Sequence, residues 1–179
     1  MKIFLSGGSK SGKSMLAQRF LRDFPECGRR CYIATMQPHD EEDRRRIARH
    51  LTERDGWGFE TVECPRDIEK CTELIAPDSA ILLDSFTALL ANEMFLPDGS
   101  CNERAADKIV PGLIKLLRHV KHAVCVSDFL YCDAALYDEY TERYRRALAQ
   151  IDRAAALECD AAAEVVCGQA VWYKGGALV

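Results

Sequence analysis

The residues with the clearest chemical potential stand near the start of the chain, where an eight-residue run from Gly7 to Ser14 reads Gly-Gly-Ser-Lys-Ser-Gly-Lys-Ser. This run fits the phosphate-loop pattern G-x-x-x-x-G-K-[ST]. In that pattern backbone N–H groups converge on phosphate oxygens, the lysine reaches the β- and γ-phosphates, and the last hydroxyl binds Mg²⁺. The spacing therefore predicts a nucleoside triphosphate site formed by Gly7, Gly8, Ser9, Lys10, Ser11, Gly12, Lys13 and Ser14.

The elements on either side of this run must hold it in place. Residues 2–5 form a short apolar stretch typical of a buried strand, and residues 14–21 have the spacing of an amphipathic helix. A strand, a glycine-rich turn and a helix in this order place the loop at the positive end of the helix, which stabilises an anion. A glycine-rich turn without a ligand is the simpler interpretation, but the lysine and hydroxyl in register favour the triphosphate site.

A second chemical element is Asp84, which ends the continuous apolar run 80–84. Such a run is typical of a strand buried on both faces, and its carboxyl end is where open α/β sheets bind ligands. Together with the hydroxyl of Ser14, this carboxylate would hold Mg²⁺, which prefers oxygen ligands. The alternative is a structural one, in which Asp84 or Ser85 caps the following helix.

A third element is His50, near the end of the strongly charged segment 41–50. A histidine beside several arginines can act as a ligand, a base or a nucleophile toward a phosphate. The i,i+4 spacing of glutamates and arginines in this segment is also that of a solvated helix with surface ion pairs. On residue types alone, the solvated helix is the better interpretation.

Hydrophobic patterning predicts an α/β fold with strands and helices in alternation. The expected strands are 2–6, 31–35, 59–63, 80–84, 122–127, 163–167 and 170–174. The expected helices are 13–22, 41–53, 66–75, 86–95, 102–119 and 137–158. We therefore expect a single nucleotide-binding domain over residues 1–179, built as a three-layer sandwich of the P-loop NTPase type. Its sheet would be mostly parallel, with an antiparallel edge at the C-terminus and helices on both faces.

Composition limits the classes of function. A net charge of −4 argues against a nucleic-acid-binding surface. The nine cysteines form no C-x-x-C pair and are odd in number, which favours reduced thiols in the cytoplasm over a disulfide framework or a zinc ribbon. We see neither a signal peptide at the N-terminus nor a window apolar enough for a membrane span, so we expect a cytoplasmic location.

Taken together, several segments resemble those of the bifunctional adenosylcobinamide kinase/adenosylcobinamide-phosphate guanylyltransferases of cobalamin biosynthesis. The phosphate loop is common to many families, whereas its combination with Tyr-Ile-Ala-Thr and Arg-Ile-x-x-His is far more selective. The resemblance lies within about the first 95 residues. It rests on segments 7–14, 32–35, 46–50, 61–63 and 81–85, and on Trp57 and Asn92.

The resemblance implies phosphorylation of a corrinoid, adenosylcobinamide, followed by transfer of GMP from GTP onto the new phosphate. His50 matches the histidine that carries the GMP covalently in this family, so the resemblance reverses the interpretation from composition. The implied ligands are Mg²⁺, GTP or ATP, and adenosylcobinamide or its phosphate, and a homo-oligomer is implied as well. Further nucleotide contacts are implied for Ala34, Thr35, Met36, Leu51, Thr52, Glu53, Arg54, Glu63 and Asp84.

The C-terminal half departs from the family pattern. Where the family has Asn-Glu-Val-Gly after its fifth strand, this chain reads Ser-Asp-Phe-Leu-Tyr-Cys-Asp over residues 127–133. Because this segment follows a strand at the carboxyl edge of the sheet, its replacement puts recognition of the acceptor in doubt more than binding of the nucleotide. A second interpretation therefore stays open: a diverged P-loop nucleotide-binding protein, either a small-molecule kinase or a regulatory module, that has lost corrinoid transfer.

Overall fold

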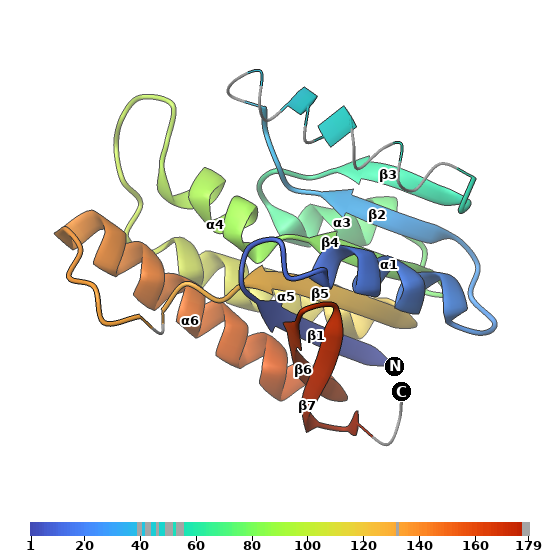
Figure 1. The fold of residues 1–179 in the computed structure, drawn as a ribbon. Helices are drawn as coiled ribbons and strands as arrows, with labels where there is room; N and C mark the ends of the chain where they lie inside the picture. Colours follow the sequence, from blue (N-terminus) through green and yellow to red (C-terminus); the bar gives the residue numbers. More distant parts are fainter. Residues whose placement is uncertain are drawn as a thin grey trace.

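The computed structural model of the protein describes residues 1–38, 41, 44, 45, 47, 48, 52, 56–131 and 133–176. Its centre is a seven-stranded sheet with the strand order β3-β2-β4-β5-β1-β6-β7 in this part of the chain (Figure 1). Strands β1 to β6 run parallel to their neighbours, and β7 pairs antiparallel with β6 at one edge. The strands are β1 Lys2–Gly7, β2 Arg30–Ala34, β3 Phe59–Glu63, β4 Ala80–Asp84, β5 His122–Asp128, β6 Ala161–Val166 and β7 Gln169–Lys174. The predicted strands and the antiparallel edge are therefore confirmed.

The central strands are apolar almost throughout because helices cover both faces of the sheet. In β4, the residues from Ala80 to Leu83 have no exposed surface. In β1, Ile3 and Leu5 point to one face while Phe4 points to the other, as the two-residue period of a strand requires. A continuous apolar run in the sequence thus corresponds to a strand in the middle layer of the fold.

The helices form the two outer layers. They are α1 Lys13–Asp23, the 3₁₀ turn η1 Ile68–Lys70, α3 Cys71–Leu74, α4 Phe86–Met94, α5 Ala105–His119 and α6 Glu139–Glu158. Ala17 and Leu21 of α1 pack on the sheet face that carries Ile3 and Leu5. The other helices pack on the opposite face, around Phe4 and Phe86 (Figure 1). The predicted three-layer arrangement with helices on both faces is confirmed.

One of the predicted helices is shorter than expected. The segment predicted as a helix over 66–75 is a 3₁₀ turn followed by a single helical turn. Asp67 precedes it with a left-handed backbone (φ 54°), and the helix ends before Pro77, whose ring disfavours helical backbone at Ala76. The predicted helix 41–53 lies largely outside the described residues.

Asn92 connects the layers at the carboxyl edge of the sheet. Its side chain is 7% exposed, and Nδ2 donates hydrogen bonds to the backbone oxygens of Thr35 (2.7 Å) and Pro65 (3.0 Å). These two residues follow β2 and β3, so one amide group in α4 binds the segments that leave the carboxyl ends of two strands. A buried amide that satisfies two carbonyl groups is costly to remove.

We expect Asn92→Ala to lower the free energy of unfolding by about 2 kcal/mol or more, because two buried carbonyl oxygens lose their donor. Urea-induced unfolding measures this change. The matched control is Asn102→Ala, which removes an asparagine whose Oδ1 accepts one exposed hydrogen bond from Arg104 N. An equal loss of unfolding free energy in both variants would show that the two Asn92 hydrogen bonds do not stabilise the segments after β2 and β3.

Candidate functional site

The loop between β1 and α1 has the backbone geometry that its glycines predict. Gly12 has a φ of 92° and immediately precedes the first residue of α1, Lys13. At Gly7, the last residue of β1, a Cβ atom would lie 2.6 Å from the backbone oxygen of Val165. Only glycine fits there, because a backbone oxygen cannot move aside as a flexible side chain can. The strand, glycine turn and helix stand in the predicted order.

The hairpin between β6 and β7 supports this loop from the side. Gly168 N donates to the backbone oxygen of Ser11 at 2.7 Å, and a Cβ atom on Gly12 would lie 3.1 Å from the Cα of Gly168. Both turn residues, Cys167 (φ 49°) and Gly168 (φ 78°), have left-handed backbone, as in a type I′ hairpin turn. This contact was not predictable from the sequence, because the two segments are far apart along the chain.

Lys13 is the most constrained side chain of the loop. It is 7% exposed, and its Nζ lies 2.6 Å from Asp128 Oδ1 and 2.9 Å from the backbone oxygen of Gly8. Asp128 ends β5 and lies opposite Gly7 in the parallel register of β1 and β5. Since a buried ammonium group needs an anionic partner, Asp128 is part of the site. Asp128 lies in the divergent segment 127–133, and no pattern in the sequence predicted this pairing.

Asp84 lies at the same edge of the sheet, at the end of β4. It pairs in register with Val126 of β5, so Asp84 and Asp128 point to the face covered by α1, where Lys13 also lies. Asp84 Oδ2 accepts a hydrogen bond from the Tyr32 hydroxyl at 3.0 Å. The capping role falls to Ser85, whose Oγ accepts from Ala88 N at 3.5 Å.

The other residues predicted to contact nucleotide divide into two groups. Ala34 and Glu63 end β2 and β3, and Thr35 and Met36 follow β2, so all four lie at the carboxyl edge. Thr35 is fully buried and exchanges two hydrogen bonds with the backbone of Ser85, each of 2.9 Å, which ties β2 to the end of β4. Of the second group, Thr52 donates from Oγ1 to the backbone oxygen of Ala48 at 3.1 Å. The predicted His50, Leu51, Glu53 and Arg54 lie outside the described residues.

The groups that could hold a metal ion here are oxygen donors. Within the described residues, no cluster of three or more His, Cys, Asp or Glu side chains could bind a metal by itself. Mg²⁺ is usually held by one or two protein oxygens together with substrate phosphates and water. The hydroxyl of Ser14 and the carboxylate of Asp84 fit this mode of binding.

Below the loop, on the opposite face of the sheet, lies a buried polar cluster. Ser6 and Ser127 are adjacent in the register of β1 and β5. Asp152 of α6 is 3% exposed and lies next to Ser127. Ser6 Oγ has no hydrogen-bond partner among the described residues. Asp152 Oδ2 accepts from the Tyr131 hydroxyl at 2.9 Å. Burial raises the pKa of Asp152 to about 7, although the nearby Ser127 and Tyr131 hydroxyls favour its charged form.

Other titratable residues have structural roles. His119 Nε2 lies 2.8 Å from the backbone oxygen of Ile75, and His122 stacks on Phe24 with ring centroids 4.7 Å apart. Arg145 pairs with Glu142 at 2.6 Å and with Asp133 at 3.0 Å. The eight cysteines in the described part of the chain are free thiols.

A mostly parallel sheet and a glycine loop that leads into α1 define an α/β protein of the P-loop NTPase type. Solved structures agree on the fold. A flagellar accessory protein FlaH from Methanocaldococcus jannaschii superposes with a TM-score of 0.53 at 15% identity, covering 97% of this chain and 77% of that one. The KaiC-like protein PH0186 from Pyrococcus horikoshii gives 0.51 at 13% identity, covering 91% and 69%.

The sequence model of the cobinamide kinase / cobinamide phosphate guanyltransferase family matches residues 3–172, and the chain belongs to this family. The match extends well beyond the first 95 residues that carried the resemblance. Two curated relatives are named bifunctional adenosylcobalamin biosynthesis protein CobU. The one from Salmonella typhimurium is 38% identical over 100 residues, which are 55% of this chain and 53% of the relative. The one from Escherichia coli is 33% identical over 97 residues, or 53% and 51%.

The matched stretch thus spans about half the length of these curated relatives. As to membranes, no helix in the described residues has both the length and the apolar character needed to cross one.

The buried carboxyl group of Asp152 makes the free energy of unfolding depend on pH. The unfolded chain loses this proton near pH 4, whereas the folded chain keeps it to about pH 7. The folded state therefore binds more protons in this window, and the free energy of unfolding falls as pH rises, by at most about 1.4 kcal/mol per pH unit from this group. Above pH 7 the contribution levels off.

We expect Asp152→Asn to remove this slope and to be more stable than the parent at pH 8. Urea-induced unfolding at pH 5 and pH 8 measures the difference. Asp107→Asn, which makes the same change at an exposed position on α5, is the control and should keep the parental slope. An unchanged slope in Asp152→Asn would exclude Asp152 as its source.

Proposed function

We propose that this chain is a transferase of cobalamin biosynthesis that phosphorylates adenosylcobinamide and then transfers GMP from GTP onto the product. The observation that carries the proposal is the position of Lys13, buried at the end of the loop against Asp128, in a chain that belongs to the cobinamide kinase / cobinamide phosphate guanyltransferase family. The curated relatives, both named bifunctional, support the assignment of two activities.

In the kinase step, the loop binds the triphosphate and Lys13 balances the charge of the β- and γ-phosphates. Backbone N–H groups from Gly8 to Ser14 face the phosphates at the N-terminus of α1, where the helix dipole stabilises negative charge. ATP or GTP would serve as donor. Ala34, Thr35, Met36 and Glu63 would contact the nucleotide from the neighbouring strand ends, as would Thr52 and the segment 51–54.

Ser14 and Asp84 would hold Mg²⁺, for which their oxygen atoms are suitable donors. When bound, the ion neutralises phosphate charge that develops during transfer. Tyr32 donates to Asp84 Oδ2 at 3.0 Å and so fixes the orientation of this carboxylate.

Asp128 is our candidate for orienting the acceptor. Its carboxylate contacts Lys13 Nζ at 2.6 Å, so an alcohol that approaches the γ-phosphate passes close to it. In this role Asp128 accepts the proton of the hydroxyl group as the oxygen attacks phosphorus and the nucleoside diphosphate leaves.

In the second step, the imidazole of His50 would attack the α-phosphorus of GTP with release of pyrophosphate. The GMP then passes from the histidine to the phosphate of the corrinoid, and His50 is regenerated. The imidazole must be neutral to attack. Arg46, Arg49 and Arg54, which are close to His50 in the sequence, would disfavour its protonated form and neutralise charge on the phosphate.

We expect Lys13→Ala to weaken binding of the triphosphate strongly and to abolish phosphorylation, because the β- and γ-phosphates lose their charge partner. Isothermal titration with GTP and ATP, together with transfer of labelled γ-phosphate, measures both effects. Lys10→Ala is the matched comparison, since Lys10 has an exposed side chain and contributes its backbone N–H, which the variant keeps. Unchanged affinity and rate in Lys13→Ala would refute the assignment of the loop.

We expect His50→Ala to abolish guanylyl transfer and to leave the kinase step intact. Incubation of the parent protein with Mg²⁺ and α-labelled GTP should give an acid-labile GMP adduct, which peptide mapping should place on His50. If both activities fell equally while the fold was kept, His50 would instead position the nucleotide. Bound GTP without any adduct in the parent protein would favour a diverged kinase or a regulatory module.

A further inference from the structure

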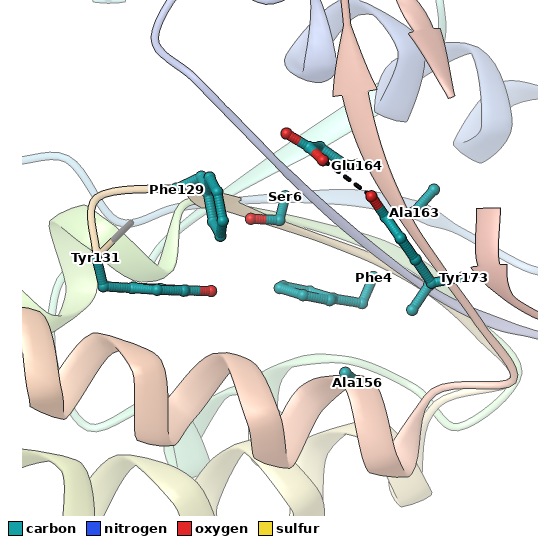
Figure 2. Close-up of a pocket in the computed structure, with 9 residues that line it drawn as sticks. Phe4, Ser6, Phe129, Tyr131, Ala156, Ala163, Glu164 and Tyr173 are labelled. Carbon is teal, nitrogen blue, oxygen red and sulfur yellow. Dashed lines mark hydrogen bonds between the residues drawn. The ribbon is translucent and has the colours of Figure 1, made fainter. Parts of the chain in front are cut away.

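A cavity of about 270 Å³ lies on the face of the sheet opposite α1 (Figure 2). Its walls are aromatic rings from three elements: Phe4 of β1, Tyr173 of β7, and Phe129 and Tyr131 of the segment after β5. Figure 2 shows α6 as the floor, with Ala156 pointing into the cavity. Nothing in the nucleotide site described above accounts for this space.

The cavity adjoins the phosphate loop directly. Ser6, which lines it, immediately precedes Gly7. Phe129 immediately follows Asp128, and its N–H donates to the backbone oxygen of Gly7 at 3.0 Å. Two residues that line the cavity are therefore direct chain neighbours of Gly7 and Asp128 at the carboxyl ends of β1 and β5.

The pleat of β1 separates the cavity from the nucleotide. The side chains of Lys13, Asp84 and Asp128 lie on the α1 face, whereas Phe4 and Ser6 point to the α6 face. A triphosphate held at the N-terminus of α1 thus leaves the cavity to a different molecule. The molecule that must meet the γ-phosphate at this edge is the acceptor.

The chemistry of the walls defines what fits. Most of the lining is aromatic or alanine, so an apolar group is stabilised there by burial. Ser6 is 9% exposed, and its Oγ has no hydrogen-bond partner among the described residues, so this oxygen can bond one polar atom of a ligand. The carboxylate of Glu164 at the rim accepts from the Tyr173 hydroxyl at 3.2 Å.

Size gives a further limit. Sites that enclose a whole small molecule usually measure about 300–1,000 Å³, so this cavity suits one arm of a larger molecule. We propose that the cavity binds an uncharged, methyl- or methylene-rich arm of the acceptor alcohol, with Ser6 Oγ bonded to a polar atom of that arm. This inference rests on the proposed kinase function and identifies the surface that selects the acceptor.

The test uses the full chain and fills the cavity from its floor. In Ala156→Leu the added atoms occupy space that the arm needs. The matched control is Ala154→Leu, two positions away on α6, at a half-buried residue that does not line the cavity. With adenosylcobinamide as acceptor and saturating Mg·ATP, we expect the KM for the acceptor to rise at least about tenfold in Ala156→Leu. The control, and the Kd for ATP in both variants, should stay at the parental value.

A second pair of variants tests the cavity without changing Ala156, so that a folding defect in Ala156→Leu cannot account for the result. Tyr173 is 74% exposed at the rim, and Tyr140 is 60% exposed on α6 away from the cavity. Tyr173→Ala should raise the KM for the acceptor, and Tyr140→Ala should leave it unchanged. An unchanged KM in both cavity variants, or an equal rise in the controls, would overturn the inference while the kinase function stood.

Failure of the proposed function is recognised separately, by an absence of corrinoid phosphorylation in the parent protein. The cavity is then tested with a neutral alcohol probe, N-(2-hydroxypropyl)acetamide, in the presence of Mg·ADP. Binding at the cavity predicts shifts in the NMR methyl signals of Ala156 and Ala163 that are lost in Tyr173→Ala. No shift at millimolar probe would overturn the cavity assignment as well, whereas a shift would support it with another alcohol as the acceptor.

Discussion

The central constraint on this molecule is that β1 is hydrogen-bonded on both sides to parallel strands, β5 and β6. Parallel neighbours bring their carboxyl ends to one edge, so Gly7 and Asp128 arrive side by side although more than a hundred residues separate them. Helices on both faces exclude water from the strands, which explains their continuous apolar sequences. The loop, its lysine and the partner of that lysine all depend on this register.

The alternation of side chains along the strands divides the edge into two compartments. Lys13, Asp84 and Asp128 lie on the face of α1, and Ser6, Ser127 and Asp152 lie on the face of α6. One position along β1 or β5 is enough to change compartment. A charged, metal-compatible surface and a largely aromatic cavity can therefore lie within a few residues of each other, because the backbone of the sheet stands between them.

The segment after β5 connects the two compartments and is also where the chain departs from the family pattern. Asp128 faces the lysine of the loop, and the two aromatic residues Phe129 and Tyr131 line the cavity, with ring centroids 5.0 Å apart. An Arg145 side chain, 8% exposed, donates to the backbone oxygen of Leu130 at 2.8 Å and holds the segment against α6. A change of sequence at Phe129 or Tyr131 therefore changes the lining of the cavity, whereas a change at Asp128 removes the partner of Lys13.

The phosphate loop, the strands within a few residues and the α/β class could be predicted from the sequence, because glycine spacing and hydrophobic period are local properties. The sequence also indicated that Asp84 ends a buried strand at the carboxyl edge. Three features depend on the folded chain: the pairing of Lys13 with Asp128, the hydrogen bond from Gly168 to Ser11, and the cavity beside Ser6. These contacts join residues far apart along the chain, and their partners are selected by strand order and register, which no local pattern encodes.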